Sequence, residues 1–140
     1  MISSLLFTMK PFLLRTLAAA WLLVLLGFTA QAQADLGPVR GALRNGSAHE
    51  LAQFLAPAIE ISFDGDKQNF NATQAELVLK DFFAKNGPIG FDFIHQGSSG
   101  EGIQYAVGRY ASRGGTYRVY VKLKPSRGAP VIDNLDFTKE

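Results

Sequence analysis

The side chains of this sequence that could carry acid–base chemistry are few. Histidine, whose ordinary pKa lies near neutrality, occurs only at His49 and His95. His95 lies three positions after Asp92 in a segment that we expect to be a strand, and Tyr110 is a third weak candidate for a catalytic group. Side chains alternate along a strand, so this odd spacing places Asp92 and His95 on opposite faces and argues against a simple acid–base dyad. We interpret His49 as a solvated residue of a short helix.

A second set of residues combines basic and aromatic side chains. If Arg113 and Gly114 form the two-residue loop of a hairpin, Arg109 and Arg118 stand directly opposite each other. Like charges opposed on a sheet are destabilising by up to about 1 kcal/mol, so a nearby carboxylate or an anionic ligand should offset them. Aromatic rings beside basic groups could also bind carboxylate or sugar groups. The carboxylates within reach would be Asp92, Asp133 or Asp136, and the predicted binding surface consists of Arg109, Arg118, Tyr105, Tyr120 and Lys122.

The other face of the same hairpin has large residues on one strand and small residues on its neighbour. In this register Gly108 faces Val119. A helix that lies across the sheet would need that room, and we expect the helix that carries Phe82 to occupy it.

Several classes of site are excluded or disfavoured. The chain has no cysteine, which rules out thiolate metal sites and cysteine nucleophiles. Asp64-Gly65-Asp66 is similar to the start of a calcium loop, but Ala75 stands at the closing position, so we interpret it as a tight turn. The glycine-rich segment 97–102 lacks the lysine and spacing of a phosphate loop. We expect no metal and no cofactor.

The N-terminal segment has the three-part form of a secretory signal peptide. Lys10 and Arg15 precede an uncharged apolar run over 17–30, which ends in overlapping small-residue cleavage patterns at Ala32 and Ala34. At about 1.5 Å per residue, this run spans roughly 21 Å, whereas a bilayer core is about 30 Å thick. We therefore expect cleavage, with a retained membrane anchor as the alternative.

Cleavage would change the charge of the working protein. The whole chain has 14 basic and 12 acidic residues, and residues 1–34 hold two basic residues and no acidic one, so residues 35–140 are balanced at 12 of each. A neutral domain gives no argument for nucleic-acid binding. The sequence predicts a signal peptide over 1–34 and a single domain over 35–140 that works as an exported protein, periplasmic or secreted.

The remaining pattern indicates helices followed by strands. Two capping boxes, Ser47 to Glu50 and Thr73 to Glu76, predict helices over 48–55 and 74–86, after an earlier helix over 37–44. Successive strands separated by turn residues favour hairpins, so we expect an α+β domain with a mainly antiparallel sheet of four to five strands. The predicted strands cover 58–63, 91–95, 103–111, 116–124 and 131–137.

Three segments of the chain resemble a known protein family. They are 71–83 (NATQAELVLKDFF), 91–98 (FDFIHQGS) and 115–120 (GTYRVY), and the similarity extends over most of residues 38–137. The family consists of small exported bacterial proteins of unknown function with a nuclear-transport-factor-2-like, or cystatin-like, fold. The resemblance implies helices packed on the concave face of a curved antiparallel sheet, and it implies no catalytic residues.

The sequence therefore predicts only a broad class of function, and three classes of protein stay open. The leading hypothesis is a non-catalytic module that binds a small ligand or a protein through the concavity or the basic and aromatic face. The first alternative is an acid–base enzyme of the isomerase or dehydratase type that uses a cone-shaped pocket. The second alternative is a scaffold that forms a homodimer through the exposed face of the sheet.

Overall fold

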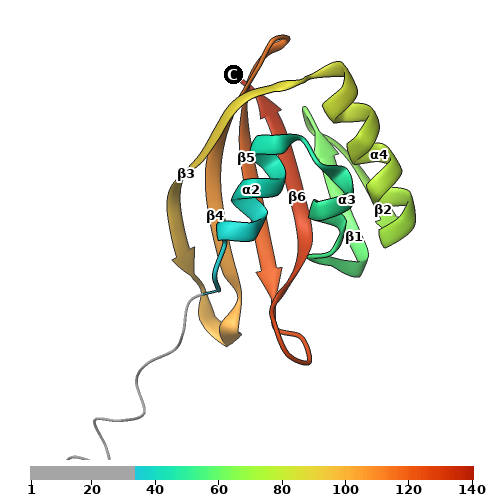
Figure 1. The fold of residues 1–140 in the computed structure, drawn as a ribbon. Coiled ribbons are helices and arrows are strands. Elements are labelled where there is room, and N and C mark those ends of the chain that lie inside the picture. The colour runs from blue at the N-terminus through green and yellow to red at the C-terminus, as the bar shows by residue number, and fades with distance from the viewer. Residues whose placement is uncertain (1–33) are drawn as a thin grey trace, which may run out of the picture. The chain divides into compact units, whose positions relative to one another are not determined.

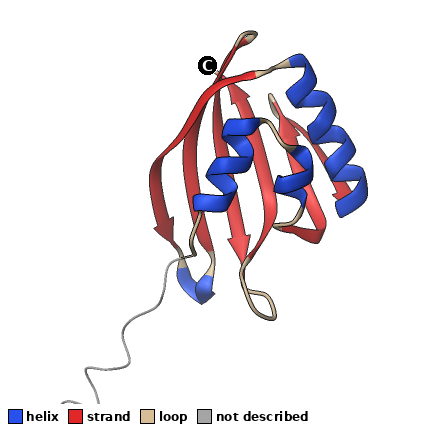
Figure 2. Ribbon diagram, in the orientation of Figure 1, coloured by secondary structure: helices blue, strands red, loops and turns tan. Residues whose placement is uncertain are grey.

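The computed structural model describes residues 34–140, and residues 1–33 of the predicted signal segment, Ala32 among them, lie outside the described residues. Three α-helices lie on one side of a curved six-stranded sheet (Figures 1 and 2). The helices are α2 (Gly37–Asn45), α3 (Ala48–Ala52) and α4 (Ala72–Lys85), with a short 3-10 helix, η1 (Gly100–Gly102). The strands are β1 (Leu55–Phe63), β2 (Asp66–Asn71), β3 (Pro88–Ser98), β4 (Gln104–Ser112), β5 (Gly115–Lys124) and β6 (Val131–Lys139). The predicted α+β class is confirmed.

The sheet contains one strand more than the upper end of our prediction. Its order is β2-β1-β6-β5-β4-β3, antiparallel throughout except for the parallel β1–β6 pair. The missed strand is β2, whose sequence DKQNFN is exposed except for the half-buried Phe70 and so lacks an apolar alternation. The predicted tight turn is present and makes this hairpin: Asp64 and Gly65 have φ values of 52° and 85°, which is the left-handed region favoured in two-residue hairpin loops.

Strand β1 begins earlier than predicted, at Leu55 instead of Ala58, and α3 ends at Ala52. Pro57, two residues beyond the predicted end of the helix, lies inside the strand. It is tolerated because the pairing with β6 is interrupted between Leu55 and Glu60, so the missing N–H of Pro57 breaks no ladder bond there.

Both predicted helix starts are capped, but one cap lies at a different residue. The Ser47 side chain accepts from the backbone N–H of Glu50 at 3.2 Å, which is one of the two bonds of the predicted capping box. In α4 the cap is Asn71 and not Thr73: Asn71 Oδ1 accepts from Gln74 N at 2.8 Å, and Gln74 Oε1 accepts from Asn71 N at 3.1 Å. The helix starts earlier because this reciprocal pair already satisfies the first free amides as the chain leaves β2.

The β4–β5 register is confirmed. Ser112 pairs with Gly115 across the Arg113-Gly114 loop, and Arg109 therefore pairs with Arg118. The room beside Gly108 has a different occupant from the one predicted. A Cβ at Gly108 would lie 2.4 Å from Cζ of Phe91 on β3, so that space is filled by a neighbouring strand instead of the helix that carries Phe82.

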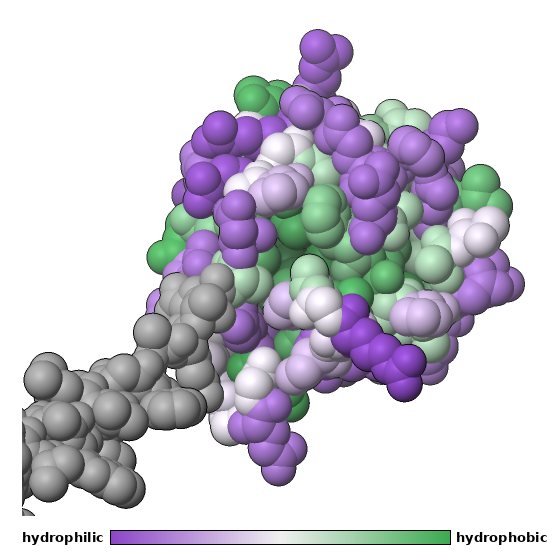
Figure 3. Space-filling model, turned by 60° about the horizontal axis from the view of Figure 1, so that its bottom comes forward, coloured by the Kyte–Doolittle hydropathy of each residue, from purple (hydrophilic) through white to green (hydrophobic). Residues whose placement is uncertain are grey.

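The helix α4 packs instead on an aromatic cluster at the other side of the concave face. The Phe82 ring lies 4.5 Å from that of Phe137, 5.0 Å from Phe63 and 5.3 Å from Tyr117, measured between centroids. Space-filling Figure 3 shows apolar residues at the centre of one face, with hydrophilic residues around them. The concave side is thus a core packed with aromatic rings, and any opening must lie at its margin.

Candidate functional site

The predicted basic and aromatic surface exists as one face. Tyr105, Arg109, Arg118, Tyr120 and Lys122 alternate with buried residues along β4 and β5, on the side of the sheet away from the helices. The rings of Tyr105 and Tyr120 are stacked with centroids 6.3 Å apart. We call these five residues, which the sequence predicted as a binding surface, the outer basic face.

The opposed arginines are only partly offset. Arg109 Nε lies 3.7 Å from Glu140 Oε2, a partner not among the predicted carboxylates. Within residues 34–140, Arg118 has no ion-pair partner. The predicted carboxylates contact groups other than the two arginines: Asp92 contacts Arg44, Asp136 accepts from the hydroxyl of Thr138, and Asp133 pairs at 3.6 Å with Lys122, which belongs to the same face.

The three weak catalytic candidates do not converge. Asp92 Oδ1 accepts from Arg44 Nη2 at 2.7 Å at the edge of the sheet, whereas His95 Nε2 lies 3.4 Å from the hydroxyl of Tyr105. Tyr110 is fully buried on the concave side and donates its hydroxyl proton to the backbone carbonyl of Asn86. Burial, with a smaller contribution from neighbouring Tyr117, raises the pKa of the Tyr110 phenol well above its usual range.

The prediction that Asp92 and His95 lie on opposite faces of their strand is wrong. Asp92 pairs with Arg109 and His95 pairs with Val107, which lie on the same face of β4. The register shift between Phe93 and His95 makes Ile94 an extra residue, and this bulge cancels the strand alternation on which the prediction depended. The two side chains nevertheless engage different partners, so no dyad forms.

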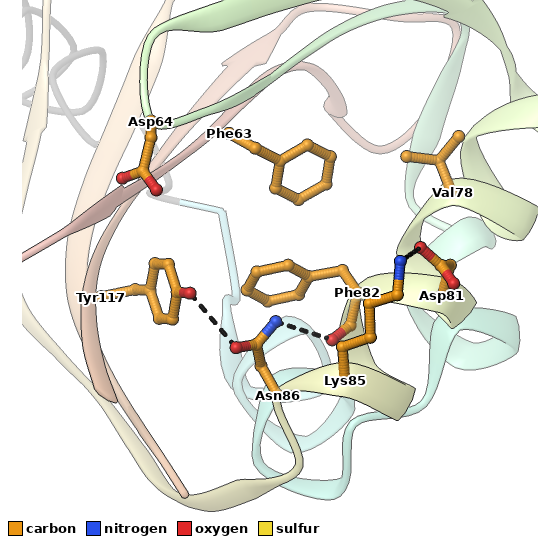
Figure 4. A pocket seen from close by; sticks show the side chains of 8 residues that line it. All are labelled: Phe63, Asp64, Val78, Asp81, Phe82, Lys85, Asn86 and Tyr117. Atoms are coloured by element: carbon orange, nitrogen blue, oxygen red, sulfur yellow. Dashed lines mark hydrogen bonds and ion pairs between the residues drawn. The ribbon is translucent and has the colours of Figure 1, made fainter. Parts of the chain in front are cut away.

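Sequence reasoning missed a cavity beside the last turns of α4. It has a volume of about 340 Å³ and opens between the C-terminal half of α4, the β1–β2 turn and the start of β5 (Figure 4). The cavity is lined by the apolar side chains of Phe63, Val78, Phe82 and Tyr117 and by the polar side chains of Asp64, Asp81, Lys85 and Asn86. We call it the α4 pocket.

Asn86 organises the wall of the α4 pocket at the end of the helix. Its Oδ1 accepts from the hydroxyl of Tyr117 at 3.2 Å, and its Nδ2 donates to the carbonyl of Phe82 at 3.2 Å (Figure 4). Its backbone carbonyl accepts a hydrogen bond from the hydroxyl of Tyr110. Three elements, α4, β4 and β5, therefore meet at one residue, which fixes the position of the Tyr117 ring.

The charged groups at the rim are held by local bonds. Lys85 Nζ donates to Asp81 Oδ2 at 2.9 Å, one helical turn away. Asp64 Oδ1 accepts from the backbone N–H of Lys139 at 2.7 Å, and its own N–H donates to the carbonyl of Phe137. These bonds attach the β1–β2 turn to the end of β6.

A partial signal for this pocket was present in the sequence. The Asp64-Gly65 turn and the end of the helix before Gly87-Pro88 were both predicted, and each supplies a wall. What brings them together is the parallel β1–β6 pair, which places the β1–β2 turn beside the end of β6 and which no local pattern indicates.

Residues 34–140 contain no cluster of three or more histidine or acidic side chains that could hold a metal ion. The same part of the chain has no helix long and apolar enough to cross a membrane.

The curved sheet with helices on its concave side is the architecture of the nuclear-transport-factor-2-like domains. The chain is similar to a protein of that class, of unknown function, from Silicibacter pomeroyi, with a TM-score of 0.56 and 11% identity over 75% of this chain and 89% of that one. Within this class, the chain belongs to the DUF4783 family, a domain of unknown function that matches residues 36–138.

Solved members of the family agree with this assignment. A DUF4783 protein from Bacteroides ovatus is 28% identical, with a TM-score of 0.74, over 78% of this chain and 98% of that one. Another from Bacteroides uniformis is 22% identical, with a TM-score of 0.70, over 74% and 94% of the two chains. A comparison with curated proteins gave no match.

Proposed function

We propose that this protein is a non-catalytic small-ligand-binding module and that the α4 pocket is its binding site. The observation that carries the proposal is the pocket itself, about 340 Å³ in volume with an aromatic floor and a polar rim. Ligand sites are concave, have volumes of about 300–1,000 Å³ and combine mostly apolar walls with a few placed polar groups. The α4 pocket matches this description at its lower limit, which favours a small ligand.

The arrangement of acid–base groups favours binding over catalysis. A general acid or base must lie within hydrogen-bond reach of the group that it protonates. Asp92, His95 and Tyr110 have separate partners, and none of the three lines the α4 pocket. The isomerase or dehydratase alternative, which relied on these three side chains, therefore has no site assembled from them.

A pair of neighbouring residues on α4 allows a controlled test of the binding site. Val78 lines the pocket and is half-buried, whereas Leu77 beside it points away and is 64% exposed. The substitution Val78→Trp should fill the pocket, and Leu77→Trp adds the same ring outside it.

The experiment is a ligand-observed NMR screen of small aromatic fragments against the purified protein. We expect fragments that bind the wild-type chain and the Leu77→Trp chain but lose binding in Val78→Trp. Circular dichroism confirms that each variant is folded, and shift mapping on the wild-type chain locates the site without any variant. A screen without binders, or binders that Val78→Trp leaves unaffected, would overturn the proposal.

We also propose that the protein is exported and processed at Ala32. The composition of 1–34 supports export. Cleavage after Ala32 keeps Ala34, whose N–H donates to Gln104 Oε1 at 2.8 Å, whereas cleavage after Ala34 removes that contact. The intact mass of protein recovered from outside the cytoplasm should correspond to a chain that begins at Gln33. Recovery of only the uncleaved chain, held in the membrane, would contradict processing, and recovery of the chain only from the cytoplasm would contradict export.

A second candidate function is self-association through the outer face of the sheet. The supporting observation is the division of charge on that face: exposed Arg118 lies on β5, while Glu60 on β1 and Asp136 on β6 have no ion-pair partner among residues 34–140. A second copy turned by a two-fold axis could set arginines against carboxylates. Light scattering should then show a dimer that Arg118→Glu dissociates, and a monomeric wild-type chain would end this candidate.

A further inference from the structure

We propose that the ligand of the α4 pocket is a small organic cation with an apolar body, such as an aryl or alkyl ammonium compound. This inference rests on the proposed binding function and adds the chemical class of the ligand. It is drawn from the charges, the aromatic rings and the hydrogen-bond acceptors that line the pocket.

The charges of the pocket favour a cation. Its lining contains two carboxylates, Asp64 and Asp81, and one ammonium group, that of Lys85. The ammonium group already donates to Asp81 at 2.9 Å, so the two largely neutralise each other. Asp64 has no ion-pair partner among the residues that the structure describes, and its one bond to Oδ1 comes from a backbone amide, which leaves Oδ2 free. The net charge of the lining is therefore negative.

The aromatic rings of the pocket also favour a cationic ligand. Phe63, Phe82 and Tyr117 all line the cavity, and Figure 4 shows the two phenylalanine rings at its centre with Tyr117 and Asp64 on one side. The face of an aromatic ring carries partial negative charge and attracts ammonium groups within about 6 Å of its centroid. An apolar body attached to the cation would pack against Phe82 and Val78.

The hydrogen-bonding groups near Asp64 are acceptors. The hydroxyl of Tyr117 gives its only proton to Asn86 Oδ1, so its oxygen can only accept further bonds. Asp64 Oδ2 is also an acceptor. A ligand that enters this side of the pocket meets two acceptors, which suits the N–H groups of an ammonium ion and disfavours a carboxylate.

An adjoining hollow also combines apolar walls with an acidic side chain. It has a volume of about 140 Å³, shares Phe63 and Val78 with the α4 pocket, and is lined further by Ile61, Asp66, Gln68 and Phe70. It contributes one more carboxylate and no basic group. A ligand longer than one ring could place its apolar end in this hollow without meeting a positive charge.

The turn that carries Asp64 permits a substitution that removes the negative charge and the free acceptor Oδ2 while the backbone conformation is kept. Asn is well suited to the left-handed conformation at φ 52°, and its Oδ1 can accept the same bond from Lys139 N. The matched control is Asp35→Asn, since Asp35 is also exposed and also accepts one backbone N–H, from Gly37 at 3.0 Å, but does not line the pocket.

The test titrates the purified protein by NMR with three probes of similar size at pH 7: benzylamine as the cation, benzyl alcohol as the neutral compound and benzoate as the anion. We expect benzylamine to bind about three- to fivefold more tightly than benzyl alcohol, and benzoate to bind most weakly, in line with exposed charge pairs worth up to about 1 kcal/mol. Asp64→Asn should remove this preference, so that benzylamine and benzyl alcohol bind with similar affinity, whereas Asp35→Asn should leave the preference as it is in the wild-type chain.

The outcomes separate the two proposals. Equal binding of the three probes in a pocket that Val78→Trp closes would overturn the cation inference while the binding function stands. A preference for benzylamine that persists in Asp64→Asn would also overturn it. Absence of binding by every probe and every fragment would overturn the binding function itself.

Discussion

The amide oxygen of Asn86, at the end of α4, accepts a hydrogen bond from the hydroxyl of Tyr117 on β5 at 3.2 Å. This bond joins the longest helix to the sheet at the edge of the α4 pocket. The backbone carbonyl of the same residue accepts a hydrogen bond from the hydroxyl of Tyr110. The Asn86 hydrogen bonds therefore form the wall of the pocket and also attach α4 to the sheet. A loss of these bonds should be detectable as a change in the free energy of unfolding.

Asn86→Ala should lower the free energy of unfolding by about 1–3 kcal/mol, because the hydroxyl of the buried Tyr117 loses its acceptor and the Phe82 carbonyl loses a donor. Urea denaturation followed by circular dichroism measures the change. Asn69→Ala, at an exposed position of β2, is the control and should change stability little. If the two substitutions changed the free energy of unfolding equally, the Asn86 hydrogen bonds would not stabilise the fold.

The buried Tyr110 should make stability fall at high pH. Its pKa is raised in the folded state by burial, so the folded chain retains a proton that the unfolded chain releases above about pH 10. The contribution is fully present below that pH and is lost as the pH rises further, by up to about 1.4 kcal/mol per pH unit. Denaturation between pH 8 and 11.5 should show a steeper fall for the wild-type chain than for Tyr110→Phe. Parallel curves would contradict the assignment.

Gly108→Ala should destabilise the protein by about 1–3 kcal/mol. The added Cβ would lie 2.4 Å from Cζ of Phe91 and 2.9 Å from the carbonyl oxygen of Asp92, a backbone atom that cannot move independently. Gly90→Ala, on the paired strand, has nothing within 4 Å of its Cβ and is the control. Thermal unfolding compares them, and similar melting temperatures for the two variants would refute the close approach of Phe91.

Arg118→Glu should stabilise the monomer by about 0.2–1 kcal/mol at low salt, because it converts the opposed Arg109–Arg118 pair into one of opposite charge. The gain should shrink as salt is added, since exposed charges are screened. Denaturation of wild-type and variant chains at two salt concentrations measures it. A variant less stable than the wild type in a monomeric protein would mean that another group already neutralises Arg118.

Local patterns in the sequence predicted much of the fold. The β4–β5 register followed from the two-residue loop at Arg113-Gly114 together with the sorting of apolar residues, and it is confirmed pair by pair. Polar strand β2 could not be found in this way, because a strand that buries only part of Phe70 has no alternation to detect. The bulge at Ile94 was also missed, and it decided which face His95 occupies.

The candidate site depended on long-range placement, which local patterns do not encode. Phe63 and Phe82 are separated in the sequence by the whole of β2 and most of α4, and their rings nevertheless stack at 5.0 Å. The sequence did identify the outer basic face, because its residues lie within one hairpin whose register is local. The α4 pocket needs the parallel β1–β6 pair, which joins segments from opposite ends of the domain.

The most direct test of the central claim is an amide shift map of the purified protein during titration with benzylamine. The binding account predicts that the perturbed amides cluster at Asp64, Val78, Asn86 and Tyr117 around the α4 pocket. Perturbations that cluster instead at Tyr105, Tyr120 and Arg118 on the outer basic face, or no saturable perturbation at all, would contradict it.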